Sequence, residues 1–475
     1  MKKILIFIFI CTAIYANGKP TLIDKQIIDL SLNYKFEEAE NLLKELINKS
    51  DEIKNDYLYL NIELVKSIHA AEVVPWKKKK AVKDSVNKIL IDYSEKVIEK
   101  YEDKNLSIYE KFYLGNIYGM LGRFYGVDRS WMSAFSNGKE GKNILEEVIE
   151  QDPNFTDAYL LLGMMNYYAD RLGGVTEFIA GILGLSGDRK VGLEYLNKVE
   201  KNGNLSKWQA TMILAEIYAR MENDKFDALP LLKKFNKSFP ENTHFANWYC
   251  YELVDLYQIK DAGKIIASAE SDKVTDMVKG KYYHLVGNYI KWNEIYDTLL
   301  AEKGMIYPWV YEDSKFNQAI NFVMLGDLKT AEKISKELNE SYSKLVKPFL
   351  ESPKIAKKFL EFSKNIFLDN ADAIESINTP PNFENSKFYE AYYNYFIGVY
   401  YFQKDKSQLA EKYFLKSKEL DSDSFKYDSI KYLIQIYKTT NANREAVSKL
   451  IDEIDDLDND AFEFSAKDLE EKYNL

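Results

Sequence analysis

The sequence predicts an all-α protein built as an α-solenoid of stacked antiparallel helix pairs. Apolar residues recur at helical spacing along most of the chain, and a helix-pair pattern returns several times. Glycine (21) and proline (10) are scarce among 475 residues, as expected where short turns join helices. Tyrosine (36) and phenylalanine (26) are abundant and fall mostly at helical spacing. One helix pair cannot bury its apolar face alone, so the pairs are expected to stack.

A small residue recurs in the first helix of the predicted pairs. These small residues are Gly115, Gly163, Ala215, Cys250 and Gly398. The step from Ala215 to Cys250 is 35 residues, whereas the two preceding steps are 48 and 52 residues. These longer steps predict insertions of about 14 and about 18 residues into two consecutive repeats.

The clearest copy of the pattern runs from Phe388 to Ser422 and resembles the tetratricopeptide repeat (TPR). Gly398, Tyr401, Ala410 and Phe414 fall there at the spacing of a 34-residue repeat. The other copies are degenerate, but their recurrence makes the chain similar to an exported, bacterial-type TPR protein. The resemblance implies that the recurring small residues lie where the two helices of each pair touch. It also implies that the first helices of successive pairs line a concave binding face.

Both predicted insertions lie between the first and second helix of their repeats and therefore emerge on the same edge. They run from Arg123 to Asn137 and from Arg171 to Gly187. We call their apolar side chains the inserted rim, which is expected to contact a partner or a membrane surface, or to fold back onto the protein. A hinge or a lid would show the same sequence. The rim comprises Trp131, Phe135, Phe178, Ile182 and Leu185.

The N-terminus has the pattern of an export signal. Lys2 and Lys3 precede the unbroken apolar run Ile4 to Ile10, which is too short to span a bilayer. Cleavage is expected after Ala16, or after Gly18. The mature protein is then expected to be periplasmic or associated with the cell envelope, and not an integral membrane protein.

The predicted domains follow from this pattern. A signal peptide at 1–16 precedes a helical solenoid at 17–377, which carries the insertions at about 123–137 and 171–187. A linker at 378–386 contains Pro380 and Pro381, and consecutive prolines hold a chain extended. C-terminal repeats are expected at 387–475.

Motifs for chemistry are not found in the sequence. His69, His244 and His284 have no partner at metal-ligand spacing, and the GxSxG, GxxxxGK[ST] and GxGxxG patterns do not occur. We therefore expect no catalytic residues, no cofactor and no metal. The formal charge of −10 offers no broad attraction for nucleic acid. Cys250 is expected to be a buried small residue.

The TPR resemblance also implies which side chains line the concave face. Many of them are Tyr or Asn, which combine flat apolar area with a polar tip and suit extended peptides or glycans. Tyrosines that pack between repeats would give the same sequence. The residues are Tyr109, Asn116, Met164, Tyr167, Tyr168, Gln209, Arg220, Asn247, Tyr251, Tyr392 and Tyr395.

Three functions remain open at this stage. The first is a non-enzymatic TPR scaffold that binds a protein or peptide partner in the envelope through its concave face and the inserted rim, with possible peripheral contact to the membrane. The second is a glycan- or peptide-binding periplasmic protein. The third is an enzyme whose site is assembled from distant repeats, which residue spacing does not exclude.

Overall fold

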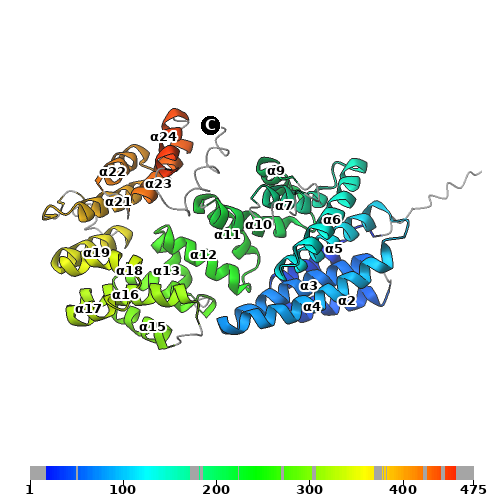
Figure 1. Ribbon diagram of the computed structural model, residues 1–475, viewed down its shortest axis with the longest axis horizontal. Coiled ribbons are helices and arrows are strands. Elements are labelled where there is room, and N and C mark those ends of the chain that lie inside the picture. Colours follow the sequence, from blue (N-terminus) through cyan, green and yellow to red (C-terminus); the bar gives the residue numbers. More distant parts are fainter. Residues whose placement is uncertain are drawn as a thin grey trace, which may run out of the picture. The chain divides into compact units, whose positions relative to one another are not determined.

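A computed structural model describes residues 18–49, 52–171, 181, 186–222, 224–268, 272–301, 306–368, 377, 379–380, 382–420, 425–439 and 444–455. All regular structure in these ranges is helical (Figure 1). The expected signal peptide and the rim residues Phe178, Ile182 and Leu185 lie outside them. The described helices are all too short or too polar for a membrane crossing.

The chain divides into two compact units, the first formed by Met1–Ala71 with Ala81–Ala210 and the second by Glu72–Lys80 with Thr211–Leu475. The helices that begin in the first unit are α1 (Leu22–Leu32), α2 (Phe36–Ile47), α3 (Ile53–Glu72), α4 (Trp76–Tyr101), α5 (Ile108–Val127), α6 (Trp131–Gln151), a 3-10 turn (Thr156–Ala158), α7 (Tyr159–Asp170), α9 (Arg189–Asn202) and α10 (Lys207–Glu216).

The second unit opens with a π-helical turn at Ile217–Met221 that continues α10. Its other helices are α11 (Lys225–Ser238), α12 (Thr243–Asp255), α13 (Ile259–Ala267), α14 (Asp276–Leu285), α15 (Tyr289–Ala301), α16 (Pro308–Leu325), α17 (Leu328–Ser335), α18 (Glu340–Glu351), α19 (Pro353–Leu368), α21 (Lys387–Gln403), α22 (Ser407–Leu420), α23 (Lys426–Thr439) and α24 (Arg444–Asp455).

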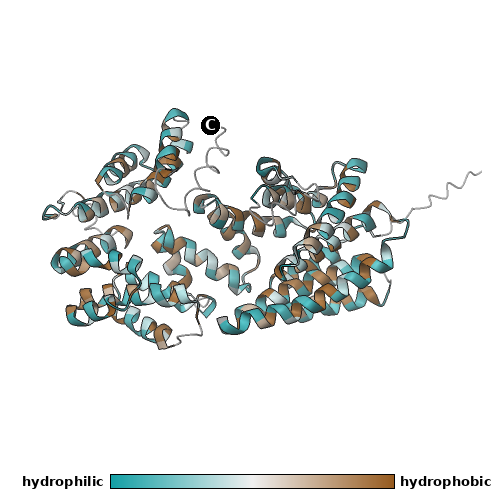
Figure 2. Cartoon of the chain, viewed as in Figure 1, coloured by the Kyte–Doolittle hydropathy of each residue, from teal (hydrophilic) through white to brown (hydrophobic). Residues whose placement is uncertain are grey.

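Consecutive helices pack against one another in both units, as the solenoid prediction requires. The pairs in closest contact are α5 with α6, α7 with α9, α14 with α15, α16 with α17 and α21 with α22. Figure 2 shows that the helices carry apolar and polar residues together instead of being apolar all round. The predicted all-helical architecture of paired, stacked helices is therefore confirmed for the described residues.

Glycines set the close approach of α5 and α6. A Cβ atom added to Gly115 would lie 2.8 Å from the side chain of Leu145, and one added to Gly141 would lie 2.6 Å from the carbonyl oxygen of Gly115. Both distances are shorter than real Cβ contacts, so only glycine lets the two backbones meet here. Gly115 thus lies in the contact between paired helices, where the repeat pattern placed it.

The first predicted insertion is helical. Its residues extend α5 to Val127 and start α6 at Trp131, with a short turn between them. The two helices span 20 and 21 residues, so the extra chain lengthens the pair. The second insertion is described only in part. Asp188, directly after its last residue, caps α9 by accepting a hydrogen bond from the Val191 backbone N–H (2.9 Å).

The core of the second unit continues on both sides of the predicted linker at 378–386. The ring of Phe359 on α19 stacks on that of Tyr389 on α21, with centroids 4.9 Å apart. Tyr389 also donates its hydroxyl to the Pro348 carbonyl (2.9 Å). The division of the chain at this linker stays a prediction.

Candidate functional site

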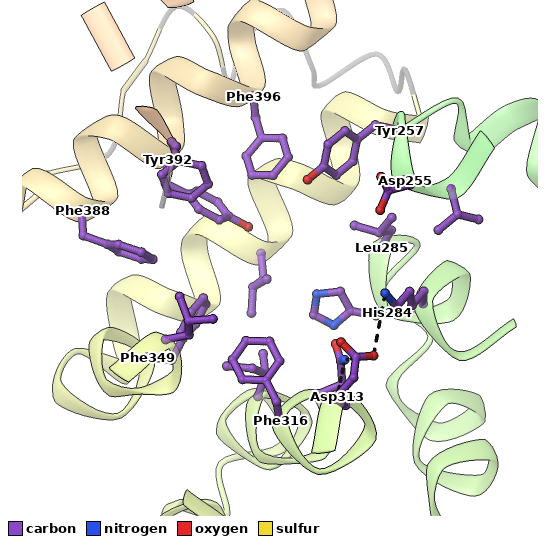
Figure 3. A pocket seen from close by; sticks show the side chains of 17 residues that line it. Asp255, Tyr257, His284, Leu285, Asp313, Phe316, Phe349, Phe388, Tyr392 and Phe396 are labelled. Carbon is purple, nitrogen blue, oxygen red and sulfur yellow. Dashed lines mark hydrogen bonds and ion pairs between the residues drawn. The ribbon is translucent and has the colours of Figure 1, made fainter. Parts of the chain in front are cut away.

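The second unit contains a cavity of about 360 Å³ (Figure 3). Side chains from α12, α14, α16, α18, α19 and α21 line it, together with Tyr257 after α12 and Phe425 before α23. Ten of the 17 lining residues are apolar, which is typical of ligand sites. They are Val254, Leu285, Phe316, Ile320, Leu345, Phe349, Leu360, Phe388, Phe396 and Phe425.

One side of the cavity is polar and is built by α14 and α16. Lys281 and His284 are three residues apart and share one face of α14. The Nζ atom of Lys281 lies 3.8 Å from Oδ2 of Asp313 on α16. Asn317, one turn further along α16, donates its side-chain N–H to the Asp313 carbonyl oxygen (2.7 Å) and to Oδ2 (3.2 Å). The carboxylate is therefore oriented by its own helix as well as by the lysine.

His284 is a further group of this polar side. Its ring packs edge-on against Trp292, with centroids 4.2 Å apart. Burial, together with the nearby positive charge of Lys281, lowers the pKa of His284 to about 4. The imidazole is therefore neutral at neutral pH. Its Nδ1 atom is buried and has no hydrogen-bond partner in the described chain.

The other side of the cavity is a wall of aromatic rings. Phe388, Tyr392 and Phe396 recur every four residues and so share one face of α21. The rings of Tyr392 and Phe396 are 4.6 Å apart at 67°, and Phe349 on α18 meets Phe388 at 5.8 Å. The Tyr392 hydroxyl is hydrogen-bonded to Ser363 (2.9 Å). The hydroxyl group of this aromatic wall is therefore already hydrogen-bonded within the protein.

Further charged groups lie next to Asp255, the cavity residue at the end of α12. Asp255 forms a close ion pair with Lys225 on α11, and Lys225 also lies 3.6 Å from the buried Glu252. Glu252 accepts a hydrogen bond from the indole N–H of Trp248 (2.8 Å). Burial raises the pKa of Glu252, against the opposing effect of Lys225.

Tyr257 joins the polar and aromatic sides. Its backbone adopts φ of +56°, a left-handed conformation that disfavours a bulky residue. The ring compensates by stacking on Phe367 (4.7 Å, 11°) and meeting Phe396 edge-on (5.1 Å). Gln403 at the end of α21 donates to the Tyr257 carbonyl oxygen (3.0 Å). This turn is thus held to α21, which forms the aromatic wall.

Three sequence-predicted residues of the first unit lie on the expected helices but already contact other side chains or backbone groups. Tyr109 on α5 lies with its ring 5.6 Å from Phe155. Asn116 is buried and donates to the Phe112 carbonyl oxygen in its own helix (2.8 Å). Gln209 on α10 donates to Asn61 Oδ1 (3.3 Å).

Three further predicted residues lie together on α7. Tyr167 is fully buried, with Arg171 over its ring at 5.1 Å. Tyr168 meets Tyr167 edge-on at 5.4 Å and is half-buried, as is Met164. Tyr168 and Met164 therefore remain accessible, whereas Tyr167 is part of the core.

The remaining predicted residues belong to the second unit. Arg220 is exposed in the π-helical turn and lies 4.8 Å from the Trp248 ring. Asn247 accepts a hydrogen bond from the Thr275 backbone N–H (2.8 Å). Tyr395 is buried against Phe425 (5.3 Å).

Two predicted tyrosines have a place at the site. Tyr392 lines the cavity itself. Tyr251 on α12 lies behind it, between Lys225 (5.5 Å) and Lys281 (5.4 Å), and both ammonium groups face its ring.

The described part of the inserted rim is the tip of the α5–α6 pair. Trp131 and Phe135 stack with centroids 6.3 Å apart and are half-buried. Val127 and Met132 beside them are 51% and 54% exposed. An apolar tip therefore exists on this edge.

Sequence analysis missed most residues of the cavity, including Asp255, Lys281, His284, Asp313 and Phe349. For the residues of α16 a signal was present in the spacing, because Asp313, Phe316, Asn317 and Ile320 share one face of that helix. In the ranges that the structure describes, no group of three His, Cys, Asp or Glu side chains could hold a metal.

No family model and no curated protein matches the sequence. Among solved structures, the chain is similar to a chain of the APC/C hetero-tetramer Cut9–Hcn1 (13% identity, TM-score 0.24), over 94% of this chain and 89% of that one. It is also similar to a monomeric IFIT1 mutant with m7Gppp-AAAA (12% identity, TM-score 0.22), over 95% of this chain and 94% of that one. Likenesses at such low TM-scores carry no argument about function. The helix pairs themselves define an all-helical protein of paired, stacked helices in the described ranges.

Proposed function

We propose that the chain is a non-enzymatic scaffold that binds an extended segment of a protein partner, with the cavity of the second unit as its main anchor site. The cavity is the observation that carries this proposal. It is lined by α12, α14 and α16, whose side chains present one face of each helix to the same space. A repeat array that exposes such faces is suited to an extended ligand.

The size and chemistry of the cavity favour side chains of a peptide. A volume of about 360 Å³ is near the lower end of the range for small-molecule sites, roughly 300–1,000 Å³. Rings and aliphatic side chains supply most of the lining, and a few polar groups give direction. This combination resembles the pockets that receive hot-spot side chains at protein interfaces.

The geometry gives less support to glycan binding. A sugar ring stacks on an exposed aromatic face, but Tyr392 is only 7% exposed, Tyr395 3% and Tyr167 0%. These tyrosines pack between helices instead. Glycan binding is therefore treated as an alternative that the crosslinking experiment below can reveal.

We further propose that the protein acts in the cell envelope after export. The support is the charged and apolar pattern of residues 2–10. The exposed apolar tip at Val127 and Met132 would provide a second contact, to the same partner or to the membrane surface.

Site-specific crosslinking tests the proposed function. A photo-reactive residue replaces Leu345, which lines the cavity and is 41% exposed, and a matched bait replaces its exposed neighbour Lys344. A third bait replaces Tyr168. We expect a defined protein at the Leu345 bait, identified by mass spectrometry and then reproduced with the purified partner. Leu345→Trp should fill the cavity and abolish binding of the purified partner, whereas Lys344→Trp should not.

Two outcomes would contradict the proposal. Equal capture at the Leu345 and Lys344 baits would mean that the cavity does not select the partner. Binding of purified polysaccharide, with no protein captured at any of the three baits, would replace the scaffold by a glycan-binding protein.

A further inference from the structure

The charges around the cavity do not balance. Five carboxylates interact electrostatically with three lysines on or directly before α11, α12, α14, α16 and α23. We call these eight residues the charged cluster, and its formal charge is −2. The carboxylates are Asp224, Glu252, Asp255, Asp313 and Asp428, and the lysines are Lys225, Lys281 and Lys431.

The unbalanced charge lies where water is scarce. The side chain of Asp313 is 15% exposed and its lysine partner is at 3.8 Å, a loose contact for an ion pair. Burial raises the pKa of Asp313 and of Asp428, and Asp255 contributes to both shifts because its charge has the same sign. A half-buried carboxylate in this position is stabilised by any additional cation.

Two other features of the cavity point to the shape of that cation. The aromatic wall of Phe349, Phe388 and Phe396 faces the charged side across the same space (Figure 3). On the charged side, the neutral His284 ring does not repel a positive group, and its Nδ1 atom has no partner. An occupant that matches both sides carries a large apolar group and an N–H-bearing cation close together.

We propose that the cavity recognises an amphiphilic cation of a peptide, formed by a large apolar side chain next to a lysine or arginine. This deepens the proposed function and rests on it. The apolar side chain lies against the aromatic wall, and the basic group points to Asp313 and His284. An acidic neighbour is disfavoured because it would add a negative charge to the cluster.

Calorimetry with capped tetrapeptides tests the proposal on the full mature chain. The three probes are acetylated and amidated Gly-Phe-Lys-Gly, Gly-Phe-Glu-Gly and Gly-Ala-Lys-Gly. We expect the Phe-Lys peptide to bind at least about tenfold more tightly than either of the others, since each lacks one of the two interactions. Equal affinity of the Phe-Lys and Phe-Glu peptides would overturn the proposal.

An asparagine substitution provides the sharper test. Asp313→Asn keeps the shape of the side chain but changes the cluster charge from −2 to −1 and removes the carboxylate that pairs with Lys281. The preference for the Phe-Lys peptide over the Phe-Glu peptide should be lost or reversed. Asp276→Asn removes an exposed carboxylate from the first turn of α14 and should preserve the preference. An unchanged preference in Asp313→Asn would also overturn the proposal, provided that its thermal unfolding matches that of Asp276→Asn.

The source of the cation is tested with 3-phenylpropylamine, which has the same two groups without a peptide backbone. Binding weaker than that of the Phe-Lys peptide supports a peptide ligand, and tighter binding assigns the site to a free amine. Failure of this inference differs from failure of the proposed function. In the first case the Leu345 bait still captures its partner, but neither competition by the Phe-Lys peptide nor an effect of Asp313→Asn is seen.

Discussion

Glycines serve helix packing differently in the two units. In the first unit, glycines bring helix backbones together, since a Cβ atom on Gly141 would lie 2.6 Å from the Gly115 carbonyl oxygen and one on Gly122 would lie 2.8 Å from that of Ala134. In the second unit, aromatic rings pack directly against the glycines instead. A Cβ atom on Gly280 would lie 3.0 Å from the Tyr296 ring.

The aromatic core of the second unit accounts for the shape of the cavity there. Backbones in direct contact leave little space between helices, whereas bulky rings hold helices further apart and fill the gap imperfectly. The core of the second unit is rich in such rings, with Trp292, Tyr296, Phe359 and Phe414 all fully buried. The space that the rings leave near α14 and α16 is the candidate site.

The largest effect on stability is expected from the hydrogen bonds of Asp157 in the first unit. The buried carboxylate of Asp157 accepts backbone hydrogen bonds from Asn204 (2.8 Å), Leu205 (3.2 Å) and Ser206 (3.0 Å). Asp157→Ala leaves these N–H groups without their acceptor and should cost about 4 kcal/mol in the free energy of unfolding, measured by urea denaturation. Asp327→Ala, which removes an exposed helix cap in the second unit, should cost less. Equal losses of stability in the two variants would show that the Asp157 carboxylate is solvated.

Protonation of His284 should destabilise the second unit. The pKa is lowered to about 4 in the folded protein, whereas an unfolded histidine titrates near 6.5. The folded state therefore binds fewer protons between these values, and its stability should fall as the pH drops from about 6.5 to about 4, by up to about 3 kcal/mol. His284→Asn should remove this component of the pH dependence in urea titrations. The same slope in the variant and the parent would contradict the assigned burial.

Alanine at the glycines compares the two packing modes directly. Gly141→Ala forces two backbones apart and should cost about 2–3 kcal/mol, even after the gain in helix propensity. Gly280→Ala meets a ring that can shift by a few tenths of an ångström and should cost about 1 kcal/mol or less. Urea denaturation of both variants measures the difference. A larger loss for Gly280→Ala would show that the rings are held as tightly as the backbones.

The smallest effect is expected at Cys250, which is fully buried on α12. Burial raises the pKa of its thiol to about 12, so almost no thiolate is present at neutral pH. A maleimide reagent should leave the native protein unlabelled over hours and label it rapidly in urea. Fast labelling of the native protein would mean that the second unit opens around α12, and that its cavity is larger than the static structure shows.

Local patterns were sufficient to predict the helix pairs, because helical spacing and small contact residues depend on neighbours in the chain. Gly115, Gly163 and Gly398 were placed at helix contacts, and each now lies against the partner helix. The length of α5 and α6 was harder to predict. The excess of residues was visible, but an insertion can extend a helix pair as readily as form a loop.

The sequence by itself determined the class of fold, the helix pairs and the lack of recognisable catalytic motifs, since these follow from residue spacing within single repeats. Only the tertiary structure decided where a ligand could bind. Asp255, His284, Asp313 and Tyr392 come from four helices and meet around one cavity. Their meeting depends on how each pair packs against the next, and side-chain volumes across those contacts set that packing. No single repeat contains this information.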